Sequence, residues 1–135
     1  MGKTILIVDD DADDRMFFNE ALMEIDKSLQ CVCARNGQEA LNLLQKANAV
    51  IPSYIFMDMN MPRLDGLQCL TQIKKIKDLQ HIPVIIFTTS KQAADAEKAK
   101  KIGADLFLSK PSRFSDLVKM LRFIIAQEWN TIKMP

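Results

Sequence analysis

Long apolar runs are missing from this sequence of 135 residues. The longest unbroken apolar stretches are short, such as residues 82–87, whereas a membrane-spanning helix needs about 20 apolar residues. The first apolar segment, residues 5–8, is followed at once by acids, which does not fit a secretion signal. We therefore expect no membrane segment and no signal peptide.

Cysteine, histidine and net charge are also scarce. Three cysteines and a single histidine, His81, support neither a disulfide framework nor a zinc site built from paired ligands. The formal net charge is +1, which argues against a nucleic-acid binder because such proteins usually carry a basic excess. A reducing cytoplasm is the simplest compartment, and Cys31, Cys33 and Cys69 are expected to be buried or half-buried packing residues.

Short apolar runs alternate strictly with amphipathic segments along the chain. Strands are predicted at residues 4–8, 31–34, 54–57, 83–87 and 106–108, and helices at residues 11–25, 38–47, 67–74, 91–102 and from 112 onward. Such alternation predicts an α/β fold with a doubly wound parallel sheet, helices on both faces and strands buried on both sides. The length fits one domain.

Polar side chains follow four of the five predicted strands directly. Ligands of an open parallel sheet bind beyond the carboxyl ends of its strands, and the residues there are Asp9, Asp10, Asp11, Asp58, Thr88 and Lys110. Close carboxylates repel one another unless a cation lies among them, and oxygen-only ligands favour Mg²⁺ or Mn²⁺. A carboxylate nucleophile beside a metal, an ammonium and a hydroxyl is suited to phosphoryl transfer.

In combination and spacing, these segments are similar to one protein family. Segments 8–10, 57–62, 65–66, 83–88, 103–105 and 110–111 resemble the receiver domain of two-component response regulators, over about residues 3–129. The resemblance implies a flavodoxin-like (βα)5 sheet with strand order 2-1-3-4-5. It implies one receiver domain over residues 1–135 without an output domain, and a signalling rather than an enzymatic role. Thr89 and Ser90 resemble stand-alone regulators that serve phytochrome-type kinases.

The resemblance also implies a phosphoacceptor and a metal site. Asp58 corresponds to the acceptor of a phosphoryl group from a histidine kinase or a histidine phosphotransfer protein. Asp10 corresponds to a Mg²⁺ ligand, with Asp9 acting through water, and the backbone carbonyl of Asn60 to a further ligand beside Asp58. Mn²⁺ is an alternative ion for this site.

A switch is implied as well. Thr88 and Lys110 correspond to the hydroxyl and the ammonium that bind the phosphoryl group, and Phe107 to an aromatic residue that changes rotamer. The Lys110–Pro111 peptide bond is expected to be cis. The surface that changes would be the fourth helix, fifth strand and fifth helix. Apolar residues of the last helix, including Phe123 and Trp129, could form a homodimer contact there.

Two other functions stay open from the residues alone. A phosphatase of the haloacid dehalogenase type forms an aspartyl phosphate at an Asp-x-Asp motif, which residues 9–11 formally contain, but its cap insertion is missing. A flavodoxin-like FMN carrier needs a phosphate-binding loop in that place, where three acids would repel phosphate without a metal. Turnover of a phosphomonoester would favour the first, and a coloured protein the second.

Overall fold

The computed structural model describes residues 3–46, 49, 51–89 and 93–126. In this part of the chain five parallel strands form one sheet in the order β2-β1-β3-β4-β5. The strands are β1 (Thr4–Val8), β2 (Gln30–Ala34), β3 (Tyr54–Met57), β4 (Val84–Thr88) and β5 (Leu106–Ser109). The helices are α1 (Ala12–Ile25), α2 (Gly37–Gln45), α3 (Gly66–Lys75), α4 (Ala93–Ile102) and α5 (Phe114–Ala126), and a short 3-10 helix, η1 (Lys77–Leu79), precedes β4. The predicted flavodoxin-like topology is confirmed.

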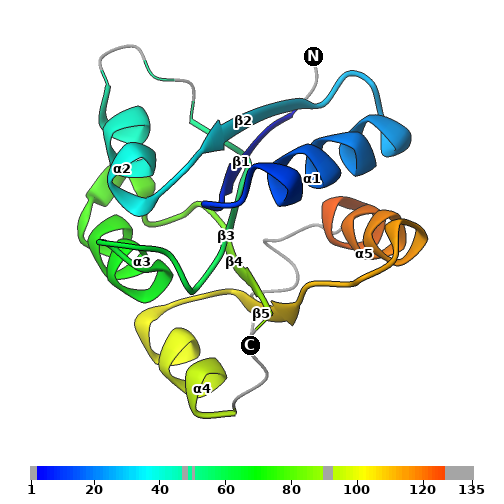
Figure 1. Cartoon of the computed structure of the whole chain (residues 1–135). Helices are drawn as coiled ribbons and strands as arrows, with labels where there is room; N and C mark the ends of the chain where they lie inside the picture. The colour runs from blue at the N-terminus through cyan, green and yellow to red at the C-terminus, as the bar shows by residue number, and fades with distance from the viewer. Residues whose placement is uncertain (1–2, 47–48, 50, 90–92, 127–135) are drawn as a thin grey trace.

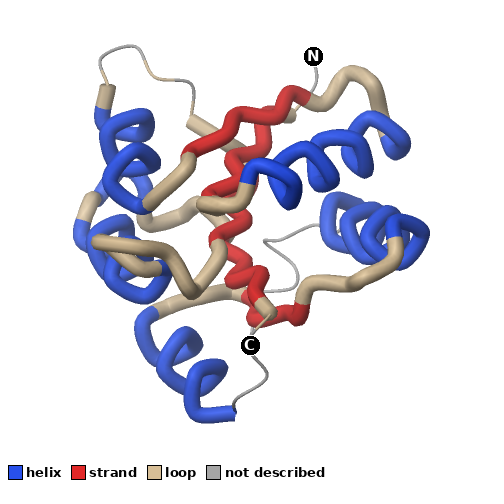
Figure 2. Tube along the Cα trace, in the orientation of Figure 1, coloured by secondary structure: helices blue, strands red, loops and turns tan. Residues whose placement is uncertain are grey.

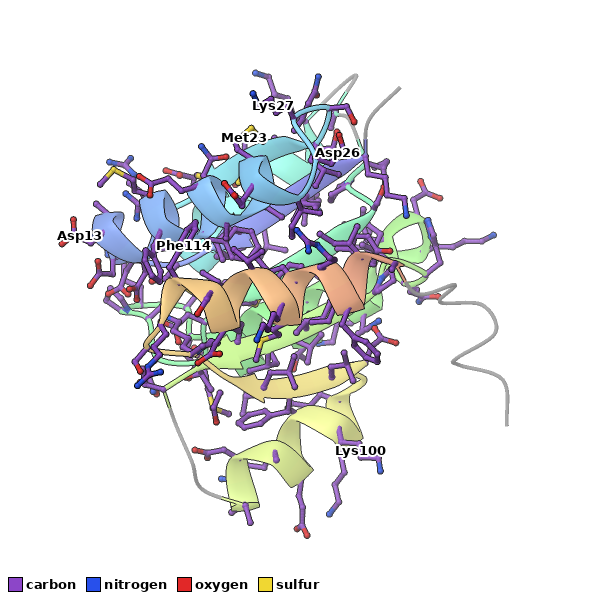
Figure 3. All side chains as sticks on the ribbon, turned by 90° about the vertical axis from the view of Figure 1, so that its right-hand side faces the viewer. Asp13, Met23, Asp26, Lys27, Lys100 and Phe114 are labelled. Atoms are coloured by element: carbon purple, nitrogen blue, oxygen red, sulfur yellow. The ribbon has the colours of Figure 1, made fainter. Side chains whose placement is uncertain are left out.

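Helices cover both faces of the sheet (Figures 1 and 2). Helices α1 and α5 lie on one face, and α2, α3 and α4 lie on the other. Strands β3 and β4 are therefore buried along their whole length, as parallel strands between two helix layers are. Figure 3 shows Phe114 between α1 and α5, where its ring centroid lies 5.3 Å from that of Phe17.

The helices that follow β1 and β3 begin at capping residues. Asp11 caps α1, since its Oδ1 accepts hydrogen bonds from the backbone N–H groups of Asp13 at 2.8 Å and Asp14 at 3.1 Å. Asp65 caps α3 in a reciprocal capping box with Gln68. Each cap contributes about 1 kcal/mol, and together they fix where the chain turns after β1 and β3, the two strands that Asp9, Asp10 and Asp58 follow.

Strand β2 departs from the prediction of strands buried on both sides. It is an edge strand, with β1 as its neighbour in the sheet, so Val32 and Cys33 are exposed. Burial raises the pKa of the half-buried Cys31 thiol and of the buried Cys69 thiol to about 12 in each case. The packing prediction therefore holds for these two cysteines and is wrong for Cys33.

A further local prediction is wrong, and several concern residues outside the described part. The Lys110–Pro111 bond is trans, since the described residues contain no cis peptide bond, and trans is the lower-energy form of such bonds. Positions 47, 90–92 and 127–135 lie outside the described residues. They include Ser90, Trp129 and one end of three predicted helices. In α5, Leu117, Leu121 and Ile124 are buried while Phe123 is exposed. No described helix combines the length and hydrophobicity needed to cross a membrane.

Candidate phosphoacceptor and metal site

The carboxyl ends of four strands bring the predicted site residues to one edge of the sheet. Backbone hydrogen bonds continue the strand ladders by one residue: the Asp58 N–H donates to the Val8 carbonyl at 2.9 Å, and the Lys110 N–H donates to the Thr88 carbonyl at 2.9 Å. Asp58 is thereby placed beside the end of β1, and Lys110 beside the end of β4. The sheet thus assembles residues that lie up to about 100 positions apart in the sequence.

Three carboxylates form a cluster at this edge. Asp9, Asp10 and Asp58 each offer an oxygen, and these oxygens lie within 4.8 Å of one another. Asp9 and Asp58 are buried whereas Asp10 is exposed. Burial raises the pKa of Asp9 and the nearby Asp58 charge adds to this, although hydrogen bonds from Lys110 and from the Asp11 backbone act in the opposite direction. An all-oxygen cluster with a negative excess has the donor chemistry that a hard divalent cation requires.

Lys110 is the cation at the centre of these acids. Its Nζ donates to Asp9 Oδ2 at 2.6 Å, to Asp14 Oδ2 at 2.9 Å and to Asp58 Oδ2 at 3.2 Å. Burial by itself would lower the pKa of Lys110, but the hydrogen bonds to Asp9 and Asp14 and the neighbouring charges outweigh it and the pKa is raised. The ammonium therefore stays charged and holds together a carboxylate from α1 and the carboxylates that directly follow β1 and β3.

The loop after Asp58 is anchored to the hydrophobic core and to the start of α3. Met59 and Met61 are buried in the core on the α3 side, and the Gly66 N–H donates to the Met59 carbonyl at 3.0 Å. A Cβ on Gly66 would lie 2.8 Å from the Met59 Cα and closer still to the Asp58 carbonyl oxygen. Only glycine fits at this first residue of α3, so Gly66 keeps the backbone of the Asp58 loop in place.

Asn60 and Asp58 are linked within the same loop. The Asn60 N–H donates to Asp58 Oδ1 at 3.4 Å, which is a long hydrogen bond. Asn60 is exposed, and Lys110 contacts the other carboxylate oxygen of Asp58, Oδ2.

Thr88 and Phe107 lie on neighbouring strands. Phe107 pairs with Ile86 in the β4–β5 register, and Thr88 pairs with Ser109. Since side chains alternate along a strand, Thr88 points to the same face as Ile86 and Phe107, the face covered by α3 and α4. Thr88 is fully buried, and Phe107 is half-buried and packs against the core there.

A cavity of about 260 Å³ lies beside Phe107. Its lining comes from α4, β5 and the loop between them and includes Ala96, Lys100, Ala104 and Phe107. Helix α4 buries only Ala99 among its described residues. Open space therefore adjoins Phe107 on this face.

The structure brings together Asp9, Asp10, Asp58 and Lys110 as the sequence predicted, and it adds residues that the prediction missed. Asp14 is the clearest of these, since its carboxylate contacts Lys110. The buried stripe of α1 contains Phe18 and Ala21, and extending it backward by four and seven residues reaches position 14. That spacing could have revealed an inward-facing acid.

Comparisons with known proteins agree with this geometry. Residues 5–122 match the family model of the response regulator receiver domain. The chain is 31% identical over 137 residues to the response regulator Rcp1 of Synechocystis sp., which covers 98% of this chain and 93% of that protein.

Two solved structures are similar to the whole fold. The phosphorylated cyanobacterial phytochrome response regulator RcpA superposes with a TM-score of 0.84 at 30% identity, covering 92% of this chain and 91% of that chain. The Mn²⁺-bound form of Rcp1 gives 0.81 at 32% identity, covering 98% and 99%. The match favours a signalling domain over the phosphatase and the FMN carrier, and the predicted phosphorelay function is confirmed at the level of the family. The chain belongs to the family of response regulator receiver domains.

Proposed function

We propose that this chain accepts a phosphoryl group on Asp58 from a sensor histidine kinase or a histidine phosphotransfer protein. The observation that carries the proposal is the position of Asp58: its Oδ2 is held by Lys110 at 3.2 Å, and its carboxylate belongs to the cluster with Asp9 and Asp10. Asp9 also contacts Lys110 and belongs to the cluster, but it is more deeply buried than Asp58. Asp10 is exposed and forms no ion pair with Lys110 among the described residues. Asp58 is the less buried of the two cluster acids that contact Lys110, and we assign it as the acceptor.

The transfer is a nucleophilic substitution at phosphorus. A carboxylate oxygen of Asp58 forms the new O–P bond while the P–N bond of the donor phosphohistidine breaks, and the bonding electron pair returns to the imidazole nitrogen. The Lys110 ammonium is placed to neutralise negative charge on the phosphoryl oxygens. The buried Thr88, at the end of the neighbouring strand β4, has the hydroxyl that would donate to one of these oxygens.

A Mg²⁺ ion is part of the proposal, with Mn²⁺ as an alternative. Asp9, Asp10, Asp58 and the backbone carbonyl of Asn60 are the ligands we propose, and the all-oxygen acidic cluster supports this set. One similar structure is of Rcp1 in an Mn²⁺-bound form. When bound, such an ion supplies positive charge that stabilises the phosphoryl oxygens.

We also propose that phosphorylation changes the surface formed by α4, β5 and α5. Thr88 would move toward the phosphoryl group, and Phe107 would turn into the space left behind. Burial of an aromatic ring contributes roughly 1.5–3 kcal/mol when complete, which shifts a two-state equilibrium by about tenfold or more. The cavity beside Phe107 and the exposed Phe123 on α5 support a change in homodimer or partner contacts at this face.

The chain would act as a phosphoacceptor that also loses its phosphoryl group to water, and not as an enzyme with turnover of an external substrate. We place it in the cytoplasm, without nucleic-acid or membrane partners. The free thiols of Cys31, Cys33 and Cys69 fit a reducing compartment.

The proposal is tested by incubating the protein with acetyl phosphate and Mg²⁺ and measuring its intact mass. We expect the mass to increase by one phosphoryl group. The increase should be absent when Mg²⁺ is chelated before acetyl phosphate is added, and absent in Asp58→Asn. Asp65→Asn is a matched control, because it removes a carboxylate from the same loop that only caps α3. An Asp58→Asn protein labelled as fully as the wild type would refute the assignment.

A further inference from the structure

Asp14 is a third acidic partner of Lys110 that the proposed phosphoryl transfer does not use. It lies in the first turn of α1, and its Oδ2 accepts a hydrogen bond from Lys110 Nζ at 2.9 Å, shorter than the bond from Lys110 to Asp58. Asp14 does not belong to the three-carboxylate cluster that fits a metal. Its contact therefore concerns Lys110 alone.

All three N–H donors of the Lys110 ammonium are used in this arrangement. An ammonium carries three N–H donors, and Asp9, Asp14 and Asp58 each accept one bond from Nζ. A phosphoryl oxygen that arrives on Asp58 must therefore displace one of these acceptors before Lys110 can bind it.

Exposure decides which acceptor is displaced at the lowest cost. The Asp9 side chain is 2% exposed, so its carboxylate would lose a partner that water cannot replace. The Asp14 side chain is 45% exposed, and water can solvate it once Lys110 leaves. Phosphorylation also removes the charge of the Asp58 carboxylate, whose bond to Lys110 is the longest of the three at 3.2 Å. Of the two acids that stay charged, Asp14 is thus the one whose bond to Lys110 yields at the lower cost.

We propose that Asp14 is a positioning residue that holds Lys110 in the unphosphorylated state and competes with the phosphoryl group for it. This inference rests on the proposed function of Asp58. Asp14 opposes the phosphorylated state in two ways: its carboxylate competes with the phosphoryl oxygens for Lys110, and its negative charge lies close to a phosphoryl group that carries further negative charge. The acid at position 14 would therefore set how readily this receiver domain becomes phosphorylated and how long it stays so.

The test compares Asp14→Asn with Asp13→Asn in the full chain. Asp13 lies in the same helical turn, and both changes remove one negative charge. Figure 3 shows Asp13 extending away from the protein at the start of α1, and among the described residues its carboxylate has no ion-pair partner. The probe is beryllofluoride, a mimic of the phosphoryl group, titrated in saturating Mg²⁺.

We expect Asp14→Asn to bind beryllofluoride about two- to fivefold more tightly than the wild type, the range for a partly exposed ion pair. Asp13→Asn should differ little from the wild type. Asp14→Glu, which keeps the charge and can still reach Lys110, should restore wild-type affinity. If Asp14 only stabilised α1, Asp14→Asn would instead bind beryllofluoride more weakly than the wild type. Asp14→Glu would then not restore the wild-type affinity.

A second measurement does not depend on the bound mimic. In the unliganded protein, the ¹⁵N resonance of the Lys110 ammonium should shift in Asp14→Asn and stay in place in Asp13→Asn. Equal beryllofluoride affinities for the two asparagine variants, or weaker binding by Asp14→Asn, would overturn the inference while leaving the proposed function intact. A wild-type protein that takes up no beryllofluoride would overturn the proposed function, and this inference with it.

Discussion

Gly66→Ala should disturb the candidate site through the backbone of the Asp58 loop. The added Cβ would lie 2.8 Å from the Met59 Cα, whereas carbon atoms in contact are separated by about 3.5–4.0 Å. Helix α3 or the loop must therefore move by about 1 Å. Forced overpacking of this kind lowers the free energy of unfolding by about 1–3 kcal/mol, and a displacement of about 1 Å at a reacting group slows its reaction up to about 100-fold.

The assay combines urea denaturation with the rate of labelling by acetyl phosphate in Mg²⁺. Gly103→Ala is the matched control, since Gly103 has a φ of 121° and its substitution costs about 1–2 kcal/mol. Gly103 lies between α4 and β5, at the opposite end of the strands, so this variant should lose stability and keep its labelling rate. Helix propensity alone favours alanine by up to about 1 kcal/mol. A Gly66→Ala protein that is more stable than the wild type and labelled at the same rate would refute the close-approach argument.

Two further predictions concern the buried acid and the switch. Burial raises the pKa of Asp9 above its ordinary 3.8, so the Asp9 carboxyl group holds its proton more tightly in the folded chain than in the unfolded chain. At neutral pH Asp9 is ionised, and its charge therefore opposes folding. In metal-free buffer at pH 7, Asp9→Asn should therefore unfold at a higher urea concentration than the wild type. This difference in stability should shrink as the pH falls toward 4. A variant less stable than the wild type at pH 7 would contradict this. Phe107→Ala should be labelled on Asp58 like the wild type, yet show no change in sedimentation on adding beryllofluoride and Mg²⁺ where the wild type does. Equal responses of the two proteins would remove Phe107 from the switch.

Much of the fold was predictable because its signals are local. The apolar runs at β1, β3 and β4 and the helical spacing of α1 and α5 each arise from burial on both faces of one sheet. The site was predictable for the same reason, since Asp9, Asp58, Thr88 and Lys110 directly follow or end strands whose carboxyl ends meet.

The rest depends on contacts between distant segments. The exposure of Cys33 follows from the edge position of β2 in the sheet order, which the apolar content of that strand does not reveal. The need for glycine at position 66 follows from how closely α3 approaches the loop after β3. The contact of Asp14 with Lys110 joins residues 96 positions apart. The trans Lys110–Pro111 bond was mispredicted because a property of relatives was carried over.

The central claim is that Asp58 carries the phosphoryl group, and the most direct measurement locates that group on the chain. Protein treated with acetyl phosphate and Mg²⁺ is reduced with borohydride, which converts an aspartyl phosphate to homoserine, and is then digested and sequenced by tandem mass spectrometry. The account predicts homoserine at position 58 and unmodified aspartate at positions 9, 10 and 14. Homoserine at one of those three positions, with aspartate intact at position 58, would contradict it.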